Sequence, residues 1–293
     1  MPDSGQGFTL GSNCPLSNQI AIIGMACRLP GASDPARLWE LLREDGNTIT
    51  EIPADRFSVD EFYDPRPATP GKMMSRFGGF LERIDQFDAD FFGISPREAA
   101  CMDPQQRVLM EVAWEAFEDA GLTLEQTPEL TAGVFMGVIT SDYWDRQSDQ
   151  PRELDVHTVG GSTRGGNAGR ISYALNFRGL SVAVDAACSS SLVAVHLAVQ
   201  SLRAGSCDVA LAGGVNMILN PDHAIGFSQG LMMAPDGQCK AFDARADGYV
   251  RSEGAAVVML KPLAKALADG DRVHAVVCGS AVKIGRASCR ERV

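Results

Sequence analysis

The chain has 293 residues, of which 45% are hydrophobic and 22% charged, so it can bury a sizeable core as one large α/β domain or two small ones. Its formal net charge of −11 argues against nucleic-acid binding, which needs a surplus of Lys and Arg on one face. No apolar run reaches the roughly 18 residues of a membrane span, and the amino terminus lacks a secretory signal, so we expect a cytoplasmic protein.

The first third of the chain predicts a strand, a helix and a long excursion. Residues 1–18 are polar and aperiodic, which predicts a flexible leader. The apolar run from Ile20 to Cys27 predicts a strand buried on both faces. Asp34 before Pro35 is typical of a helix cap followed by the first helical residue. Residues 45–94 are too long for a simple connection, so we expect a packed excursion.

The middle of the chain continues the alternation of helices and strands. Ser95 and Glu98 have the spacing of a capping box. Asp103 begins a second helix with one apolar face, which Gly121 ends. An apolar strand follows at 131–139. The glycine-rich segment 160–173 matches neither GxGxxG nor GxxxxGK[ST], so its glycines indicate close backbone packing and not phosphate binding.

A strand runs straight into a helix at Cys188. The residues before it are apolar and β-branched, and those after it repeat apolar side chains at helical spacing until Gly205. Three serines follow Cys188, and their hydroxyls are suited to capping the free N–H groups of a first helical turn. Because those N–H groups and the helix dipole favour an anion, we expect the Cys188 thiol to ionise more readily than a free cysteine. The pattern predicts a nucleophile.

Three more apolar runs, at 208–218, 254–260 and 274–282, predict further strands. The loop before the second of these contains Asp236, Asp243 and Asp247, whose spacing differs from that of an EF-hand, and we interpret them as solvated or salt-bridged. The eight cysteines include no CxxC pair. We therefore expect reduced thiols and no metal site.

Several segments resemble one family. "DAACSSSL" around Cys188 is similar to the active-site signature of β-ketoacyl synthases, specifically the ketosynthase domains of modular polyketide synthases and animal-type fatty acid synthases. "IAIIGMACRLPGA", "FFGISPREAACMDPQQRVLMEVAWEAFEDAG" and "PDGQCKAFDARADGYVRSEG" resemble the same family. Ala186 stands where Thr is usual, Ser252 where Gly is usual, and the segment at Gly166–Arg170 is an altered form of the family's "GNxxxGRxSY".

The resemblance implies a thiolase-like α/β fold. We expect a mixed five-strand sheet from Ile20 to Leu260 with helices on both faces, plus the first strand of a second half. The resemblance implies that residues 19–262 are the N-terminal half of a ketosynthase and that residues 263–282 begin the C-terminal half. Residues 283–293 contain four basic groups and one acidic group, and we interpret them as a non-native tail. Without its second half the fold would leave one apolar layer exposed, and we expect poor solubility.

The resemblance also implies a reaction. Cys188 would accept an acyl group from a carrier protein's phosphopantetheine arm as a thioester, and its backbone N–H would help to form the oxyanion hole. A malonyl group on a carrier protein would then lose CO2 and attack the thioester, a decarboxylative Claisen condensation. Acyl carrier protein and acyltransferase domains are the implied partners, a homodimer the implied assembly, and no directly bound cofactor is expected.

The histidines set a limit on that reaction. In the family, decarboxylation depends on two histidines of the second half, whereas His157, His196, His223 and His274 match no catalytic motif. We therefore expect an acyltransferase of the 3-oxoacyl-carrier-protein synthase type whose 293 residues do not condense by themselves. The alternatives are a non-catalytic chain-length partner, which usually lacks the cysteine, and a thiolase, against which "DAACSSSL" and "MDPQQR" argue.

Overall fold

The computed structural model describes residues 18–149, 152 and 154–283. Most of the predicted leader (1–18) and most of the predicted tail (283–293) lie outside these described residues, so neither prediction is tested.

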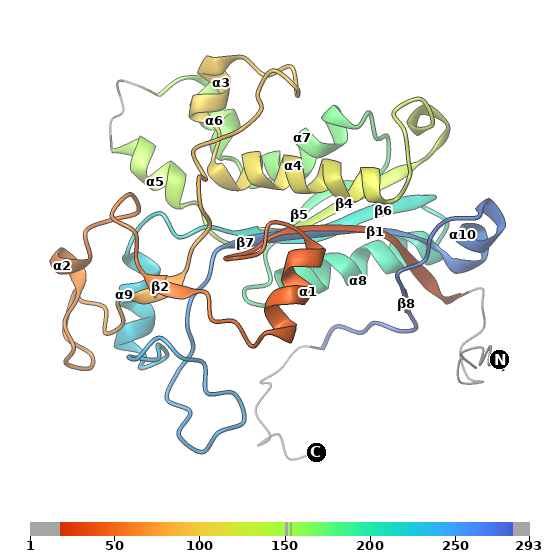
Figure 1. The fold of residues 1–293 in the computed structure, drawn as a ribbon. Helices are drawn as coiled ribbons and strands as arrows, with labels where there is room; N and C mark the ends of the chain where they lie inside the picture. Colours follow the sequence, from red (N-terminus) through yellow and green to blue (C-terminus); the bar gives the residue numbers. More distant parts are fainter. Residues whose placement is uncertain (1–17, 150–151, 153, 284–293) are drawn as a thin grey trace.

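A six-stranded sheet runs through the middle of the molecule (Figure 1). Its spatial order is β5-β4-β6-β7-β1-β8. Each apolar run of the sequence contributes one strand, although most strands are shorter than the run that predicted them. The strands are β1 (Ile20–Arg28), β4 (Ala132–Gly137), β5 (Ser181–Val184), β6 (Val209–Asn216), β7 (Gly254–Pro262) and β8 (Ala275–Val277).

The sheet is mixed, as predicted. β4 runs parallel to both β5 and β6, whereas β7, β1 and β8 join through antiparallel pairs. The strand expected at 274–282 differs from the prediction, because β8 is only three residues long. It is held at the edge of the same sheet, where it pairs with β1 and the N–H of His274 donates to the carbonyl of Ile22 at 2.9 Å.

Helices cover both faces of the sheet (Figure 1). α4 (Pro104–Asp119) and α7 (Gly166–Ala174) lie on one face, and α8 (Ser190–Arg203) lies on the other. The larger core cluster joins α4 and α7 to the strands. A second cluster packs Ala194, Ala198, Val199 and Leu202 of α8 against Phe135 and its neighbours in the sheet.

The sequence dictates how α4 begins, packs and ends. The Asp103 carboxylate accepts a hydrogen bond from the N–H of Gln105 at 2.8 Å, which caps the first turn. β1 approaches α4 closely because residue 24 is glycine: a Cβ there would lie 2.3 Å from the carbonyl oxygen of Ala116. Gly121, at a φ of 68°, follows the helix as predicted. The predicted apolar face is buried at Val108, Leu109, Val112, Ala116 and Phe117.

Residues 45–94 form a packed excursion, as predicted. In it β2 (Ile49–Glu51) pairs with β3 (Phe77–Gly79), and α2 (Val59–Phe62) lies beside them. The excursion shares a small core with the segment after β6, made of Ile52, Met73, Phe80, Ile218 and Ala224.

The capping box predicted at Ser95 forms only in part. The Ser95 hydroxyl accepts from the N–H of Glu98 at 3.2 Å, at the start of α3 (Pro96–Cys101). The Glu98 carboxylate instead accepts from Arg170 Nη1 of α7 at 2.7 Å. A tertiary ion pair has replaced the second half of the local motif.

The remaining elements lie at the periphery. On α1, the Asp34 cap forms as predicted, but Trp39 and Leu42 are 63% and 66% exposed. The peripheral helices are α1 (Pro35–Arg43), α5 (Asp142–Ser148), α6 (Val156–Ser162), α9 (Asp222–Gln229), α10 (Leu263–Asp269) and the 3-10 turn η2 (Thr127–Glu129).

Large apolar side chains are exposed on the outer side of α8, namely Leu192 (74%) and Leu197 (37%). Across the described part of the chain, no helix has both the length and the apolar character needed to cross a bilayer.

Candidate active site

Cys188 lies where β5 turns into α8, and its side chain is exposed. We call residues 185–189 the elbow. Ala187 has a φ of 51°, in the left-handed region that non-glycine residues rarely adopt. This reversal comes three residues after β5 ends at Val184, and it allows a helix to begin two residues after Cys188.

The serines after Cys188 hold the elbow together and do not cap the helix as predicted. The hydroxyl of Ser189, the residue before α8, makes no capping bond and donates to the carbonyl of Ala186 at 2.8 Å. The Ser190 hydroxyl donates to the carbonyl of Ala187 at 2.6 Å and accepts from the N–H of Ala186 at 2.9 Å. None of these bonds uses the N–H of Cys188.

The elbow opens on a cavity of about 430 Å³, which we call the Cys188 cavity. Its walls come from the carboxyl ends of β4 and β6, from α9 and from the segment that leads into β7. The carboxyl ends of parallel strands are where open α/β sheets bind ligands. The lining includes Gly137, Ile139, Thr140, Ala187, Cys188, Ser190, Ser191, Gly214, Val215, Asn216, His223, Phe227 and residues 249–256.

The close approach of β4 to α8 brings the elbow into this cavity. A Cβ on Gly137 would lie 2.5 Å from the backbone nitrogen of Ser191 and 2.6 Å from the carbonyl carbon of Ser190. Only glycine fits here without moving the start of the helix.

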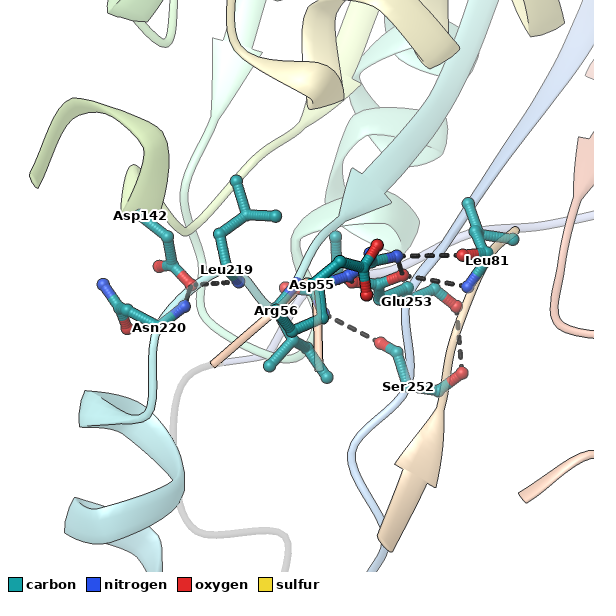
Figure 2. A network of polar contacts seen from close by, with 10 residues as sticks. Asp55, Arg56, Leu81, Asp142, Leu219, Asn220, Ser252 and Glu253 are labelled. Atoms are coloured by element: carbon teal, nitrogen blue, oxygen red, sulfur yellow. Dashed lines mark hydrogen bonds and ion pairs between the residues drawn. The ribbon is translucent and has the colours of Figure 1, made fainter. Parts of the chain in front are cut away.

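One wall of the cavity is fixed by a buried ion pair between Arg56 and Glu253, residues 197 positions apart (Figure 2). Their side chains are 2% and 0% exposed. Arg56 Nε and Nη2 donate to the two carboxylate oxygens at 2.8 and 2.9 Å. The same carboxylate accepts from the N–H of Leu81 at 2.9 Å and of Ile218 at 3.1 Å. Glu253 therefore fastens the excursion and the β6–α9 connection to the start of β7.

A second buried carboxylate, Asp142, holds the next residues of that connection. One oxygen of Asp142, Oδ2, accepts from the N–H of Leu219 at 3.0 Å and of Asn220 at 3.4 Å, as Figure 2 shows. Burial raises the pKa of Asp142. Its other oxygen is buried, has no hydrogen-bond partner among the described residues, and lies 3.8 Å from Nδ1 of His223.

Arg251 lies in the same wall. It is 8% exposed, and its guanidinium carbon lies 5.8 Å from the ring centre of Phe227. In the part of the chain that the structure describes, no partner bonds its buried Nη1. Burial lowers the pKa of Arg251, and the Asp142 carboxylate opposes that shift.

The structure separates the four histidines. His157 is in α6, His196 on α8 contacts the Ser280 hydroxyl at 3.0 Å, and His274 Nε2 lies 2.8 Å from an Asp119 oxygen. His223 alone of the four belongs to the cavity lining. This placement was not predicted, because no local sequence pattern marks residue 223 or indicates α9.

Asp236, Asp243 and Asp247, in the loop that precedes β7, pair with neighbouring cations. Lys240 Nζ lies 2.8 Å from Asp236 and 2.7 Å from Asp247, and Arg245 pairs with Asp243 at 2.8 Å. Within the described residues, no group of three or more His, Cys, Asp or Glu side chains is arranged to hold a metal.

The structure also bears on the serine at position 252, where the resembling family has glycine, and on the glycine-rich segment 160–173. Positive φ angles occur at Gly248 and Gly254 and not at Ser252, so the serine does not strain the backbone. In the glycine-rich segment, a Cβ on Gly161 would clash with Cys101 at 2.3 Å, whereas Gly165 and Gly169 face open space. Close packing explains only some of those glycines.

Comparisons with known proteins agree with this architecture. Residues 17–266 match the family model described as "Beta-ketoacyl synthase, N-terminal domain". The chain is 50% identical over 272 residues to one of the phenolphthiocerol/phthiocerol polyketide synthase subunits of Mycobacterium tuberculosis, covering 92% of this chain and 18% of that protein. It is 48% identical to phthioceranic/hydroxyphthioceranic acid synthase of Mycobacterium bovis, covering 91% of this chain and 13% of the other.

Solved structures show the same likeness. An oxazolomycin ketosynthase domain of Streptomyces albus superposes with a TM-score of 0.84 at 41% identity, covering 88% of this chain and 45% of that one. A ketosynthase from module 6 of the bacillaene synthase of Bacillus subtilis gives 0.80 at 39% identity, covering 88% and 43%. The chain thus spans less than half of each of these proteins.

Proposed function

This chain belongs to the β-ketoacyl synthase family, and we propose that its Cys188 thiolate accepts an acyl group for carbon–carbon bond formation in polyketide or fatty acid assembly. The single observation that carries the proposal is an exposed cysteine at a strand-to-helix elbow that opens on a cavity. The fold is the thiolase-like fold of the matched ketosynthases.

In the proposed loading step, Cys188 Sγ attacks the carbonyl carbon of an acyl thioester carried on a phosphopantetheine arm. The new C–S bond forms as the bond to the pantetheine sulfur breaks, and that thiol leaves with the proton. The backbone N–H of Cys188, which the elbow's serine contacts leave unused, would stabilise the oxyanion. The arm belongs to the carrier protein, so the chain itself needs no bound cofactor.

We extend the proposal to partners and to the second step. Acyl carrier protein and acyltransferase domains would supply the acyl and malonyl groups, and the ketosynthase would act as a homodimer. No histidine of this chain contacts Cys188 among the interactions of the described residues, and three of the four lie outside the cavity lining. We therefore propose that these 293 residues load an acyl group but do not decarboxylate malonyl-carrier protein by themselves.

Intact-mass spectrometry with an acyl N-acetylcysteamine thioester tests the loading step. One acyl group should appear and map to Cys188, and Cys188→Ala should abolish it. Cys239→Ser is a matched control at another exposed cysteine, and it should load normally. Equal labelling of several cysteines would overturn the proposal. Addition of malonyl-carrier protein should release no CO2, and a condensed product would refute the limit placed on the second step.

A further inference from the structure

Three aromatic side chains form a row in the wall of the Cys188 cavity. His223 and Phe227, one turn apart on α9, have ring centres 6.1 Å apart. Phe227 and Tyr249 have ring centres 6.0 Å apart, with an angle of 61° between the ring planes. All three residues line the same cavity as Cys188. We call His223, Phe227 and Tyr249 the aromatic strip.

The side chains of the aromatic strip are not buried in the core. The His223 side chain is 45% exposed, Tyr249 is 36% exposed and Phe227 is half-buried. Among the described residues, the core clusters contain none of the three, whereas Phe117 and Phe135 belong to those clusters and are almost fully buried. The strip therefore presents ring surface that a ligand in the cavity can contact.

Backbone hydrogen bonds fix two rings of the strip relative to each other. The N–H of Met232 donates to the carbonyl of Phe227 at 2.9 Å, and the N–H of Tyr249 donates to the carbonyl of Met232 at 2.9 Å. The Arg251 guanidinium, 5.8 Å from the Phe227 ring centre, packs on that ring as a cation. Rings that are held in place before a ligand arrives lose less conformational entropy when it binds.

We infer that the aromatic strip recognises an aromatic ring carried by the acyl group on Cys188, with Phe227 and Tyr249 as the specificity-determining residues. Aromatic rings attract one another in offset-stacked and edge-to-face arrangements with centres about 4.5–7 Å apart, and both pairs within the strip already have such spacings. A ring on the ligand would extend the row. This inference rests on the proposed function, because it specifies the substrate class of the same site.

Charge and size favour an aryl group over an ammonium group, the other kind of ligand that aromatic rings bind. Arg251 already places a positive charge beside Phe227, and it would repel a cationic ligand. The cavity of about 430 Å³ has the size of an ordinary small-ligand site. Ile139, Val215 and Val250 in its lining offer apolar contacts to the rest of the acyl chain.

Two matched pairs of N-acetylcysteamine thioesters test the strip at two tether lengths. They are 3-phenylpropionyl against 3-cyclohexylpropionyl, and 5-phenylpentanoyl against 5-cyclohexylpentanoyl. The members of a pair have the same number of carbons and the cyclohexyl ring is the more apolar, so a wall that offers only apolar contact would not favour the phenyl member. With the rate of Cys188 acylation followed by intact mass, the native chain should prefer the phenyl member of at least one pair by about two- to tenfold.

Variants of the strip show whether its rings cause that preference. Tyr249→Leu should bring the ratio close to one, because leucine is apolar but has no aromatic face, and Phe227→Leu should lower the ratio. Tyr249→Phe, which retains the ring without its hydroxyl, should keep the native ratio. Tyr173→Leu is the matched control and should also keep it, since Tyr173 is 90% exposed on α7 and lies outside the cavity lining.

The outcomes separate this inference from the proposed function. Equal native rates within both pairs, or a phenyl preference that is unchanged in folded Tyr249→Leu and Phe227→Leu, would overturn this inference alone. The Tyr249 side chain is partly exposed, so Tyr249→Leu keeps the test decisive if Phe227→Leu does not fold. Absence of Cys188 acylation by all four thioesters would overturn the proposed function, and this inference with it.

Discussion

Replacing Glu253 by Gln should strongly destabilise the protein, because this carboxylate is the most heavily used buried acceptor in the site wall. It receives two hydrogen bonds from Arg56 and one each from the N–H groups of Leu81 and Ile218. A glutamine has the same shape but only one oxygen, and its NH2 group can accept none of these bonds. The substitution leaves the Arg56 guanidinium charged and almost fully buried.

The size of the effect follows from those contacts. Removing one partner of a buried ion pair costs about 3–5 kcal/mol, since the other charge remains desolvated. Asp55 stays 2.6 Å from Arg56 Nη1 but is 70% exposed, so it compensates only weakly. We expect a loss of roughly 4 kcal/mol, a large fraction of the 5–15 kcal/mol that stabilises a typical protein. With an assumed slope near 3 kcal/mol per molar urea, the unfolding midpoint should fall by about 1.3 M.

Urea unfolding of the native chain, Glu253→Gln, Arg56→Met and the double variant measures this coupling. The double variant should lose at least about 2 kcal/mol less than the sum of the single losses, because each single change strands the same partner. The exposed pair Arg37–Glu40 on α1 provides the control, and Glu40→Gln should cost at most about 0.5 kcal/mol. A Glu253→Gln loss below about 1 kcal/mol would refute the reasoning.

Three other predictions concern single positions. Burial raises the pKa of Asp103 to about 6, so ionisation of this carboxyl destabilises the folded state progressively as the pH rises from about 4 to 6. Between pH 3.5 and pH 7, the free energy of unfolding of Asp103→Asn should therefore rise by about 2–3 kcal/mol relative to that of the native chain. Parallel curves of stability against pH for the two proteins would contradict this. Gly137→Ala should reduce the rate of Cys188 acylation at least about tenfold, because the new Cβ would displace the start of α8. The control Gly169→Ala faces open space in a helix and should raise the thermal midpoint slightly. A normal acylation rate in Gly137→Ala would refute the close approach of β4 to α8. Ala187→Gly should stabilise the protein by about 0.5–1 kcal/mol in urea unfolding, since the left-handed φ costs glycine less, and a lower midpoint would count against that backbone geometry.

The sequence was sufficient to predict the parts of the fold that local patterns determine. Continuous apolar runs mark strands that are buried on both faces, and they located β1, β4, β6 and β7 within a few residues. The Asp34 and Asp103 caps fixed where α1 and α4 begin, because a side-chain acceptor beside proline acts within one turn. The Cys188 elbow was predictable for the same reason, since strand, nucleophile and helix are contiguous.

The walls of the cavity were not predictable, because they depend on contacts between distant segments. Glu253 meets Arg56 across 197 residues, and no spacing rule relates the two. His223 reaches the cavity because α9 packs beside the segment that leads into β7, which the sequence around residue 223 does not indicate. Local capping logic also failed where tertiary contacts competed with it: Glu98 pairs with Arg170 instead of completing its box, and the Ser189 hydroxyl bonds a carbonyl instead of capping α8.

In this site Cys188 carries the chemistry and Glu253 carries the stability. The two roles can be separated by measuring acylation and the free energy of unfolding in variants of each residue. Cys188 is exposed and packs against little, so Cys188→Ala should abolish loading while the free energy of unfolding changes by less than about 0.5 kcal/mol. In our proposal Glu253 contacts neither Cys188 nor the acyl group. Its carboxylate nevertheless accepts a hydrogen bond from the N–H of Ile218, and Asp142 accepts one from the N–H of the next residue, Leu219. Losing Glu253 should thus release the β6–α9 connection and shift His223 and Phe227 with it. For Glu253→Gln we expect slower Cys188 acylation even in urea-free buffer where the variant remains folded, and an unaltered rate would show that the ion pair supports the fold without shaping the cavity.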